Sequence, residues 1–351
     1  MLNSRVAIVI GLGLAFGLIN NPAAIAQDGS AVVAEVGSHK ITADELQEKE
    51  AGKLLQARYK YYLAERDALD QLVEDQLLEM QAKREGISVD ELLKRHVTVQ
   101  VAEPTEDQLK FYYEGLGSDE SYDAVRGKIL ETVHQIRFTK ARTAYIDSLR
   151  SQFGVFVALT QPSAKVDVTN AYRLGPQNAP VQLVEFADYE CPYCQKVHVE
   201  LALLRAQFGD KVAVIFKDLP LPMHSSAEKA AEAARCAGAQ GKFWEFHDSL
   251  FETKKLQVAD LKQEARNLNL DGARFDKCLD SGEQAALVQK DLIQGKHLGL
   301  TGTPSFFANG HFLSGAIAYA KLRATVEEEL AAQAAQKPSV AASTVGNAVQ
   351  K

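Results

Sequence analysis

Two cysteines separated by two residues form the pattern in this sequence with the clearest chemical meaning. They stand in the run Cys191-Pro192-Tyr193-Cys194, directly after residues 181–186, an apolar stretch with the composition of a buried strand. A pair with this spacing serves three chemistries: half of a zinc site, a structural disulfide, or a dithiol that exchanges electrons with other thiols. The spacing alone leaves these three open.

The position of the pair, after a strand and at the start of a helix, favours thiol–disulfide exchange. A helical pattern begins at Cys191 and ends at Gly209. A helix N-terminus presents unpaired N–H groups and the positive end of the helix dipole, and both stabilise a thiolate. We therefore predict that Cys191 is the nucleophile and that Cys194, one turn later, is the resolving thiol. Pro192 fits the first helical turn, and with Tyr193 it helps to set the redox potential. Both residues are also expected to contact the substrate.

The N-terminal residues have the pattern of a secretory signal peptide. Arg5 supplies a positive charge, residues 6–19 are apolar, and Ala24-Ile25-Ala26 is a small-x-small cleavage site. The apolar run is shorter than an ordinary membrane span of about 20 residues. We therefore expect removal of residues 1–26 and a periplasmic location, with an uncleaved N-terminal anchor as the alternative.

The composition limits the remaining possibilities. The 351 residues are 46% hydrophobic and 24% charged, with a formal net charge of −7, which is an ordinary globular balance. The absence of a basic stripe argues against a nucleic-acid partner. The length indicates roughly two domains. In an exported protein the even number of cysteines indicates disulfides.

The hydrophobic pattern predicts a mostly α-helical N-terminal domain over residues 27–160. Its clearest element is a long helix over 122–149, with apolar residues on one stripe. Alternating valines at 97–101 and apolar residues at 155–159 have the period of strands. Residues 161–168 have the composition of a short linker.

The C-terminal part, residues 169–332, has the alternating strands and helices of the α/β class. A helical block over about 226–298 interrupts this alternation. Residues 305–314 have the pattern of a hairpin whose turn is Asn-Gly. Residues 333–351 show no periodicity and are predicted to be a disordered tail.

Three motifs in this part together resemble the DsbA family of thioredoxin-fold thiol–disulfide oxidoreductases. They are Glu185-Phe186-Ala187-Asp188-Tyr189-Glu190 before the cysteine pair, Gly241-Lys242-Phe243-Trp244, and Thr301-Gly302-Thr303-Pro304-Ser305-Phe306-Phe307. The resemblance covers roughly residues 169–330. It implies a thioredoxin fold with an inserted helical subdomain, no bound cofactor or metal, and a redox partner in the inner membrane that resets the cysteine pair.

The resemblance also implies roles for residues outside the pair. Pro304 matches the family's cis-proline beside the sulfurs, and Thr303 would offer backbone groups to an extended substrate peptide. Glu185 matches the family's buried acid, which relays a proton to or from Cys194 if burial raises its pKa; a solvent-facing glutamate at a strand end is the alternative. His198, on the same predicted helix as the cysteines, is expected to be a surface histidine, with a redox-tuning role as the alternative.

The other two cysteines, Cys236 and Cys278, fall in the implied helical insertion and lack the spacing of a redox pair. We predict a structural disulfide between them, which would add about 4 kcal/mol in the chain-entropy model. A second redox site is the alternative. A zinc site of four cysteines is disfavoured by the compartment and the spacing.

The start of the N-terminal domain resembles the SurA/PrsA-type chaperone domain. The residues concerned are Val32-Val33-Ala34-Glu35-Val36-Gly37, Ile41-Thr42 and Leu46, and the helix over 122–149 would be that domain's returning helix. The interval between them is too short for a prolyl isomerase domain. A plain helical spacer or dimerisation module, through which the chain would form a homodimer, is the alternative.

These observations predict a periplasmic thiol–disulfide oxidoreductase, an oxidase or an isomerase, that acts on unfolded or cysteine-containing exported proteins. Two other classes remain. A holdase chaperone would use the thioredoxin domain as a peptide-binding platform. A glutathione-dependent transferase on a related fold is disfavoured by Cys194, because such relatives usually lack the second cysteine.

Overall fold

The structure of the protein is a computed structural model that describes residues 29–336. The predicted signal peptide, residues 1–26, lies outside the described residues. The chain divides into two compact units between Ala51 and Gly52, and each is described by itself. Within residues 29–336, no helix is both long enough and apolar enough to span a bilayer.

The first unit is a small hairpin followed by one helix. Strands β1 (Val32–Val36) and β2 (His39–Thr42) pair antiparallel, and α1 (Ala43–Lys49) follows directly. Helix α1 begins where it does because the Thr42 hydroxyl accepts a hydrogen bond from the backbone N–H of Glu45 at 3.1 Å. The residues of β1 are all exposed.

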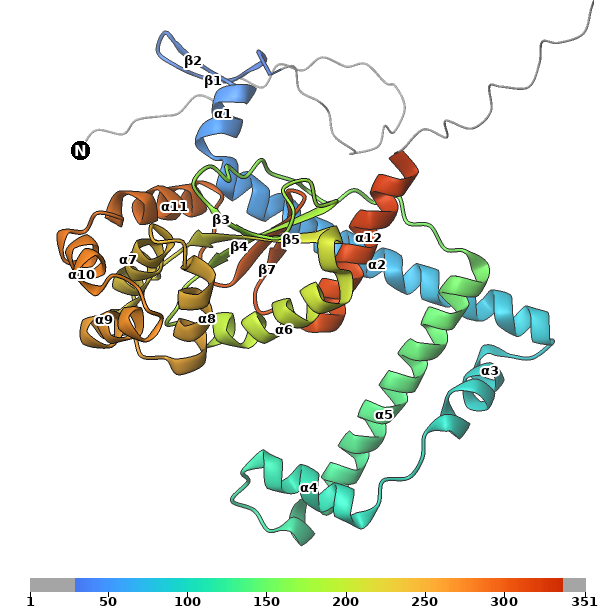
Figure 1. Cartoon of the computed structure of the whole chain (residues 1–351). Helices are drawn as coiled ribbons and strands as arrows, with labels where there is room; N and C mark the ends of the chain where they lie inside the picture. The colour runs from blue at the N-terminus through green and yellow to red at the C-terminus, as the bar shows by residue number, and fades with distance from the viewer. Residues whose placement is uncertain (1–28, 337–351) are drawn as a thin grey trace, which may run out of the picture. The chain divides into compact units, whose positions relative to one another are not determined.

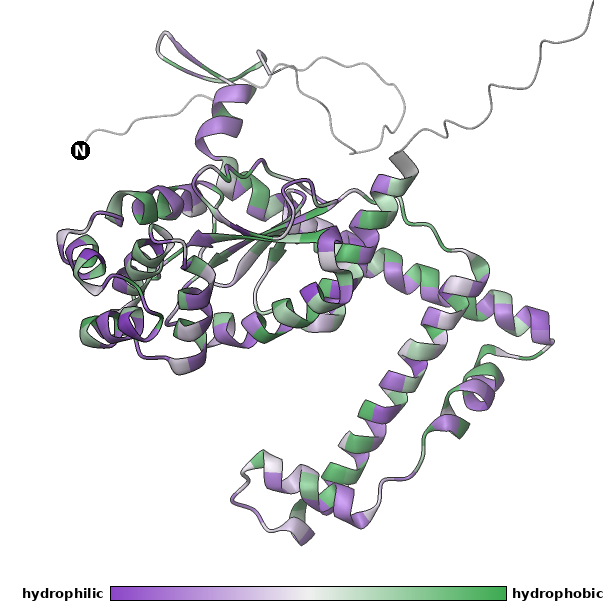
Figure 2. Cartoon of the chain, in the orientation of Figure 1, coloured by the Kyte–Doolittle hydropathy of each residue, from purple (hydrophilic) through white to green (hydrophobic). Residues whose placement is uncertain are grey.

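The second unit begins with a series of helices. They are α2 (Ala51–Glu85), α3 (Val89–His96), the short 3₁₀ helix η1 (Thr98–Gln100), α4 (Glu106–Leu116) and α5 (Tyr122–Phe153). The predicted long helix is confirmed as α5. Val125, Ile129 and Val133 are buried on the predicted stripe, whereas Ile136 on the same stripe is 51% exposed. Figure 2 shows apolar and polar residues interspersed along this helix.

Two strand predictions in this region are wrong. Residues 98–100 form η1, and residues 155–159 lie outside any strand. Val97 is fully buried as the C-cap of α3 whereas Val99 is 73% exposed, so the alternation reflects a single buried residue. The described residues offer neither segment a neighbouring strand to pair with.

A five-stranded mixed sheet forms the centre of the second unit (Figure 1). Its strands are β3 (Tyr172–Leu174), β4 (Val181–Ala187), β5 (Val212–Asp218), β6 (Ser305–Ala308) and β7 (His311–Ser314), in the order β3-β5-β4-β6-β7. Strands β4 and β5 are parallel and the other pairs are antiparallel. The predicted hairpin is confirmed as β6–β7. The sheet, with the helices on its faces, is the thioredoxin fold.

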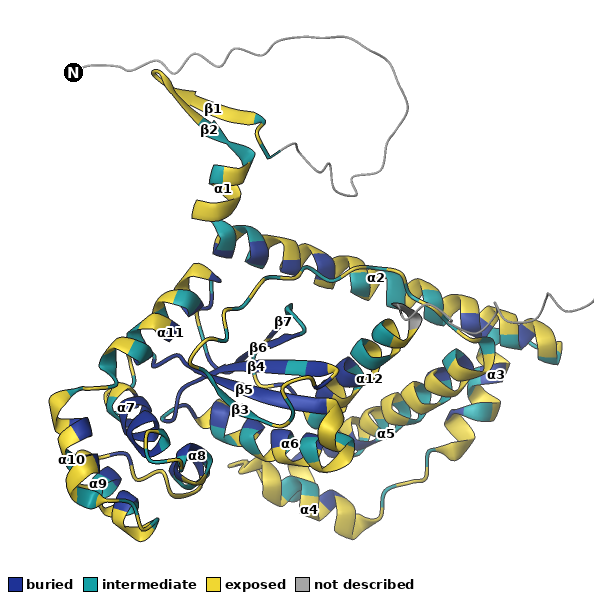
Figure 3. Ribbon diagram, turned by 45° about the horizontal axis from the view of Figure 1, so that its top comes forward, coloured by how far each residue is buried: buried dark blue, intermediate teal, exposed yellow. Residues whose placement is uncertain are grey.

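Helices cover both faces of this sheet. Figure 3 shows its central strands buried. On one face, Val181 and Leu183 of β4 pack with residues of α6 (Pro192–Phe208) and α12 (Tyr319–Gln336). On the other face, Val184 and Phe186 pack with residues of α2. The alternation along β4 therefore places Glu185 on the α6 side. Because α12 continues to Gln336, residues 333–336 of the predicted tail are helical, and the remainder lies outside the described residues.

The N-terminal half of α2 belongs to the core of the thioredoxin fold. Leu55 and Tyr59 are buried in the same cluster as Phe312 of β7, and the rings of Tyr59 and Phe312 meet edge-on at 4.8 Å. Gly52 permits this approach, because a Cβ there would lie 2.4 Å from the backbone N of Gly299. Apolar residues of the segment predicted as a linker, 161–168, pack against this cluster too.

The helical insertion consists of α7 (Ala227–Gly238), α8 (Phe243–Thr253), α9 (Val258–Asn267), α10 (Gly272–Ser281) and α11 (Ala285–His297). These bounds agree with the predicted block. Cys236 of α7 and Cys278 of α10 form a disulfide that closes a loop of 42 residues.

Candidate active site

The two remaining cysteines lie at the start of α6, immediately after the end of β4. Cys191 is the N-cap of α6 and Pro192 occupies its first turn. Cys191 is 4% exposed and Cys194 is fully buried, and both are free thiols. Tyr193, between them, is 62% exposed. The site thus presents Cys191 near the surface and keeps Cys194 beneath it.

The surroundings of the two sulfurs push their pKa values in opposite directions. The thiol of Cys194 donates a hydrogen bond to the Cys191 sulfur, and with the backbone N–H groups of Tyr193 and Cys194 it lowers the pKa of Cys191 to about 5. Burial, together with the donated hydrogen bond, raises the pKa of Cys194. At neutral pH Cys191 is therefore a thiolate and Cys194 a thiol, as a nucleophile and a resolving group require.

The loop before β6 brings Thr303 and Pro304 to the cysteines. The Sγ of Cys191 lies 3.4 Å from the backbone carbonyl oxygen of Thr303, to which it donates a hydrogen bond only in its protonated form, and the Thr303–Pro304 peptide bond is cis. Thr303 is 9% exposed. The structure therefore brings together Cys191, Cys194 and the predicted peptide-binding loop.

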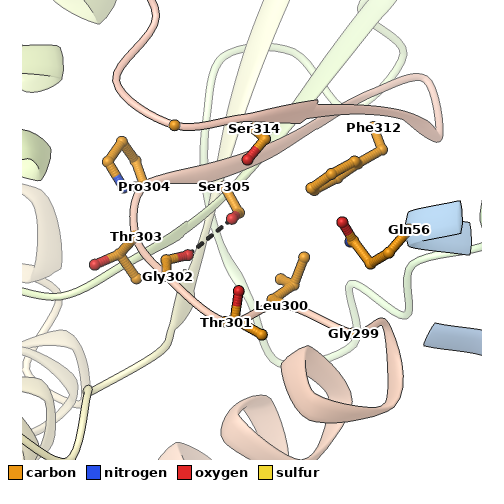
Figure 4. Close-up of a pocket in the computed structure, with 11 residues that line it drawn as sticks. Gln56, Gly299, Leu300, Thr301, Gly302, Thr303, Pro304, Ser305, Phe312 and Ser314 are labelled. Atoms are coloured by element: carbon orange, nitrogen blue, oxygen red, sulfur yellow. Dashed lines mark hydrogen bonds between the residues drawn. The ribbon is translucent and has the colours of Figure 1, made fainter. Parts of the chain in front are cut away.

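The same loop borders a cavity of about 140 Å³. Gln56 of α2 and Phe312 of β7 lie on one side of this cavity, and Thr303 and Pro304 lie on the other (Figure 4). The Ser305 hydroxyl donates a hydrogen bond to the carbonyl oxygen of Gly302 at 2.8 Å, which fixes the turn between them. Helix α2 thus lies across this cavity from the loop that carries the cis-proline.

Glu185 lies inside the domain, so the prediction's alternative of a solvent-facing side chain is wrong. Its side chain points to the α6 face of the sheet and is 2% exposed. Within residues 29–336 its carboxyl has no hydrogen-bond or ion-pair partner, and burial raises its pKa to about 8. The negative charge of Glu185, when present, raises the pKa of Cys194. The two groups are therefore coupled.

Asp188, which the sequence did not single out as a site residue, shapes the turn from β4 to α6. This buried carboxylate accepts hydrogen bonds from the backbone N–H groups of Glu190 at 2.7 Å and Leu221 at 2.7 Å, and it contacts the His224 Nδ1 at 2.8 Å. Asp188 therefore positions the backbone that delivers Cys191. Its position between Glu185 and Cys191 in the sequence motif could have indicated this role.

His198, predicted to be a surface histidine, is partly buried. Its side chain is 22% exposed. Its ring lies 5.2 Å from that of Phe251 and 5.4 Å from that of His247. The reason is that α8 of the insertion packs across α6 and covers this position.

Comparisons with known proteins agree with the fold. Residues 167–328 match the model of a protein family described as thioredoxin, which confirms the fold expected for the C-terminal part. The resemblance of the N-terminal residues to a chaperone domain stays a prediction.

Similar solved structures include oxidised BdbD from Bacillus subtilis, with 24% identity, 49% of this chain and 98% of that chain covered, and a TM-score of 0.45. A thioredoxin-like oxidoreductase from Silicibacter pomeroyi has 28% identity, 46% and 93% coverage, and a TM-score of 0.43. Among curated proteins, the Na(+)/H(+) antiporter NhaA 3 of Salinispora tropica is 36% identical over 172 residues, which are 48% of this chain and 26% of the relative. The chain thus spans about a quarter of the length of that relative.

Proposed function

We propose that the protein is a thiol–disulfide oxidoreductase that uses Cys191 and Cys194 to exchange disulfides with other proteins. The observation that carries this proposal is the opposed environment of the two sulfurs. Cys191 is a stabilised thiolate at a helix N-terminus, and Cys194 is a buried thiol within its reach. Neither a structural disulfide nor half of a zinc site requires its two sulfurs to have different pKa values.

The exchange proceeds through a mixed disulfide. In the oxidising direction, a substrate thiolate attacks Cys191 of the Cys191–Cys194 disulfide, and Cys194 leaves as a thiolate that takes up a proton. A second substrate thiolate then attacks the substrate sulfur, and Cys191 leaves as a thiolate. The substrate loses two electrons and two protons. The pair gains the two electrons, Cys194 takes up one proton, and the other proton goes to the solvent because Cys191 remains a thiolate. Reduction of a substrate disulfide follows the same steps in reverse.

We propose Glu185 as the group that exchanges the proton with Cys194. Cys194 needs a proton when it leaves and must lose one when it attacks. A carboxyl with a pKa of about 8 holds a proton at neutral pH and can release it there. The coupling between Glu185 and Cys194 supports this assignment.

The lowered pKa of Cys191 favours the oxidising direction. Stabilising the thiolate stabilises the reduced pair, and a stabilised reduced form makes a dithiol pair a stronger oxidant. We therefore propose that substrates are oxidised rather than reduced. Measured against glutathione, the pair should have a potential nearer to about −120 mV than to about −270 mV.

We further propose that the protein works in the periplasm on cysteine-containing exported proteins, with a redox partner in the inner membrane that reoxidises the pair. The disulfide between Cys236 and Cys278 supports an oxidising compartment, because such bonds persist there. The pattern of residues 1–26 supports export.

Oxidative refolding of a reduced protein with several disulfides tests the proposal. The oxidised chain should accelerate disulfide formation, Cys191→Ser should abolish the acceleration, and Cys194→Ser should accumulate a mixed disulfide with the substrate. Full refolding activity of Cys191→Ser would contradict the proposal.

A second candidate function, binding of unfolded chains, rests on exposed apolar residues in the helical region before the thioredoxin fold. Phe111 of α4 is 79% exposed, Phe156 is 86% exposed and Val99 is 73% exposed. Suppression of aggregation by Cys191→Ser, and its loss on combining Phe111→Ser with Phe156→Ser, would support this function. Equal suppression by the double variant would count against it.

A further inference from the structure

A group of two histidines and an aspartate lies on helices α6 and α8. His198 belongs to α6, and His247 and Asp248 belong to α8. One ring nitrogen or carboxylate oxygen from each lies within 4.8 Å of the others. The Nε2 of His198 lies 3.7 Å from the Oδ1 of Asp248.

His247 is held in one orientation by its neighbours. The residue is 3% exposed, and its ring packs edge-on against Phe216 at 4.6 Å and Phe251 at 5.0 Å. Its Nδ1 is hydrogen-bonded to the Tyr189 hydroxyl at 3.0 Å. The Nε2 is therefore the nitrogen that remains to bind a ligand, in the manner of metal-binding histidines whose second nitrogen is held by a neighbour.

The three residues line a cavity of about 220 Å³. Glu185 lines the same cavity, and its buried carboxyl lacks a hydrogen-bond or ion-pair partner in the part of the chain that the structure describes. Buried polar groups are nearly always paired, so an unpaired one directed into a cavity indicates a ligand there. Glu252 is a further acidic residue in the lining of this cavity, and Arg205 is the one arginine among the described residues of that lining. Acidic residues therefore outnumber arginine and lysine around the cavity.

We propose that His198, His247 and Asp248 bind a divalent transition-metal ion such as Zn²⁺, with the remaining coordination position open to the cavity that Glu185 lines. Two imidazoles and a carboxylate are a preferred donor set for such ions. Metal–ligand bonds of about 2.0–2.2 Å require the three ligand atoms to lie closer to one another than they do in this structure. Rotation of the side chains of His198 and Asp248, which are 22% and 49% exposed, allows this.

Titration of the untagged full chain with Zn²⁺ alone, followed by calorimetry, tests the proposal. The protein is first oxidised so that Cys191 and Cys194 form a disulfide and offer no thiolate to the metal. We expect one ion per chain, and binding at least about tenfold weaker in His198→Ala and in Asp248→Asn. His134→Ala is the matched control, because His134 also pairs with a carboxylate, at 2.7 Å, but lies on α5. It should bind like the wild type.

Two further measurements keep the test decisive if a variant folds poorly. Zn²⁺ should raise the Tm of the wild type and of His134→Ala but not that of His198→Ala. Co²⁺ bound to the wild type should give the intense visible absorption of a four-coordinate site. The proposal would be overturned if the wild type did not bind Zn²⁺, if all variants bound it equally, or if His134→Ala weakened binding as much as His198→Ala. A Co²⁺ spectrum like that of the hydrated ion would also overturn it.

Discussion

The sulfur of Cys191 lies 3.4 Å from the backbone carbonyl oxygen of Thr303, although 112 positions separate the two residues in the chain. The pairing of β4 with β6 produces this contact, because Cys191 follows β4 and Thr303 precedes β6 in an antiparallel pair. A substrate peptide that extends along the backbone at Thr303 would therefore place its own sulfur beside Cys191.

Alkylation of reduced Cys191 should follow a pKa of about 5. The thiolate is the reacting form, so the rate of reaction with iodoacetamide should rise through about pH 5 and level off above it. Cys194 should stay unreactive, because burial raises its pKa. Mass mapping of the alkylated peptide identifies the site. A rate that rises only above about pH 8, as for a free cysteine, would contradict the proposed environment.

Glu185→Gln should slow the step in which Cys194 leaves or attacks by roughly a hundredfold at neutral pH, because the glutamine cannot exchange a proton. Stopped-flow measurement of the decay of the mixed disulfide isolates this step. Formation of the mixed disulfide should change little. Glu245→Gln is the control, because Glu245 is an exposed residue of the same sign on α8. Equal decay rates in both variants would remove Glu185 from the mechanism.

Glu185 should also make the protein less stable as the pH rises. Its pKa is about 8 in the folded chain and about 4.3 when unfolded. Between these values the folded state binds more protons than the unfolded state, so stability falls as the pH rises through this window and is constant above it. Urea unfolding of the oxidised protein, in which Cys191 and Cys194 form a disulfide and do not titrate, should show this loss at several pH values, and Glu185→Gln should lack most of it. A parallel dependence in both proteins would contradict the raised pKa.

Local sequence patterns were sufficient to predict the elements that carry the site, whereas the thioredoxin fold followed from the family resemblance. The Asn-Gly turn located the hairpin β6–β7, and the strand before Cys191 located the helix N-terminus that its chemistry needs. These features depend on residues close together in the chain. The position of Glu185 inside the fold followed from a family resemblance, since the residue type alone indicates the surface.

Features that depend on long-range packing were not predicted from the sequence. Nothing local in the first half of α2 indicates that Leu55 and Tyr59 pack against Phe312. The partial burial of His198 likewise depends on α8. Periodicity shows that a helix has an apolar face but not which element covers it.

Loss of the disulfide between Cys236 and Cys278 should lower the free energy of unfolding by about 2–5 kcal/mol and leave thiol exchange by Cys191 unchanged. The pair ties α7 to α10 within the insertion. The double variant Cys236→Ala with Cys278→Ala, examined by urea unfolding and by the refolding assay, separates a structural from a redox role. A normal stability with a lost activity would reverse the assignment.

Leu55→Ala should destabilise the thioredoxin fold by roughly 2–5 kcal/mol, although Leu55 precedes that fold in the chain. Its side chain is 6% exposed and packs in the cluster that contains Phe307 and Phe312. Leu63→Ala is the matched control, because Leu63 lies on the same helix and is 46% exposed. That change should cost within about 0.5 kcal/mol.

The readout for this pair of variants is hydrogen exchange of the backbone amides of β6 and β7. If α2 completes the core, Leu55→Ala speeds exchange in these strands as well as in α2, because they lose a shared apolar contact. Faster exchange confined to α2 would mean that the helix only rests on the sheet. Gln56 of α2 lines the cavity beside the loop that holds Pro304. In that case the thioredoxin fold alone, without α2, would position this loop.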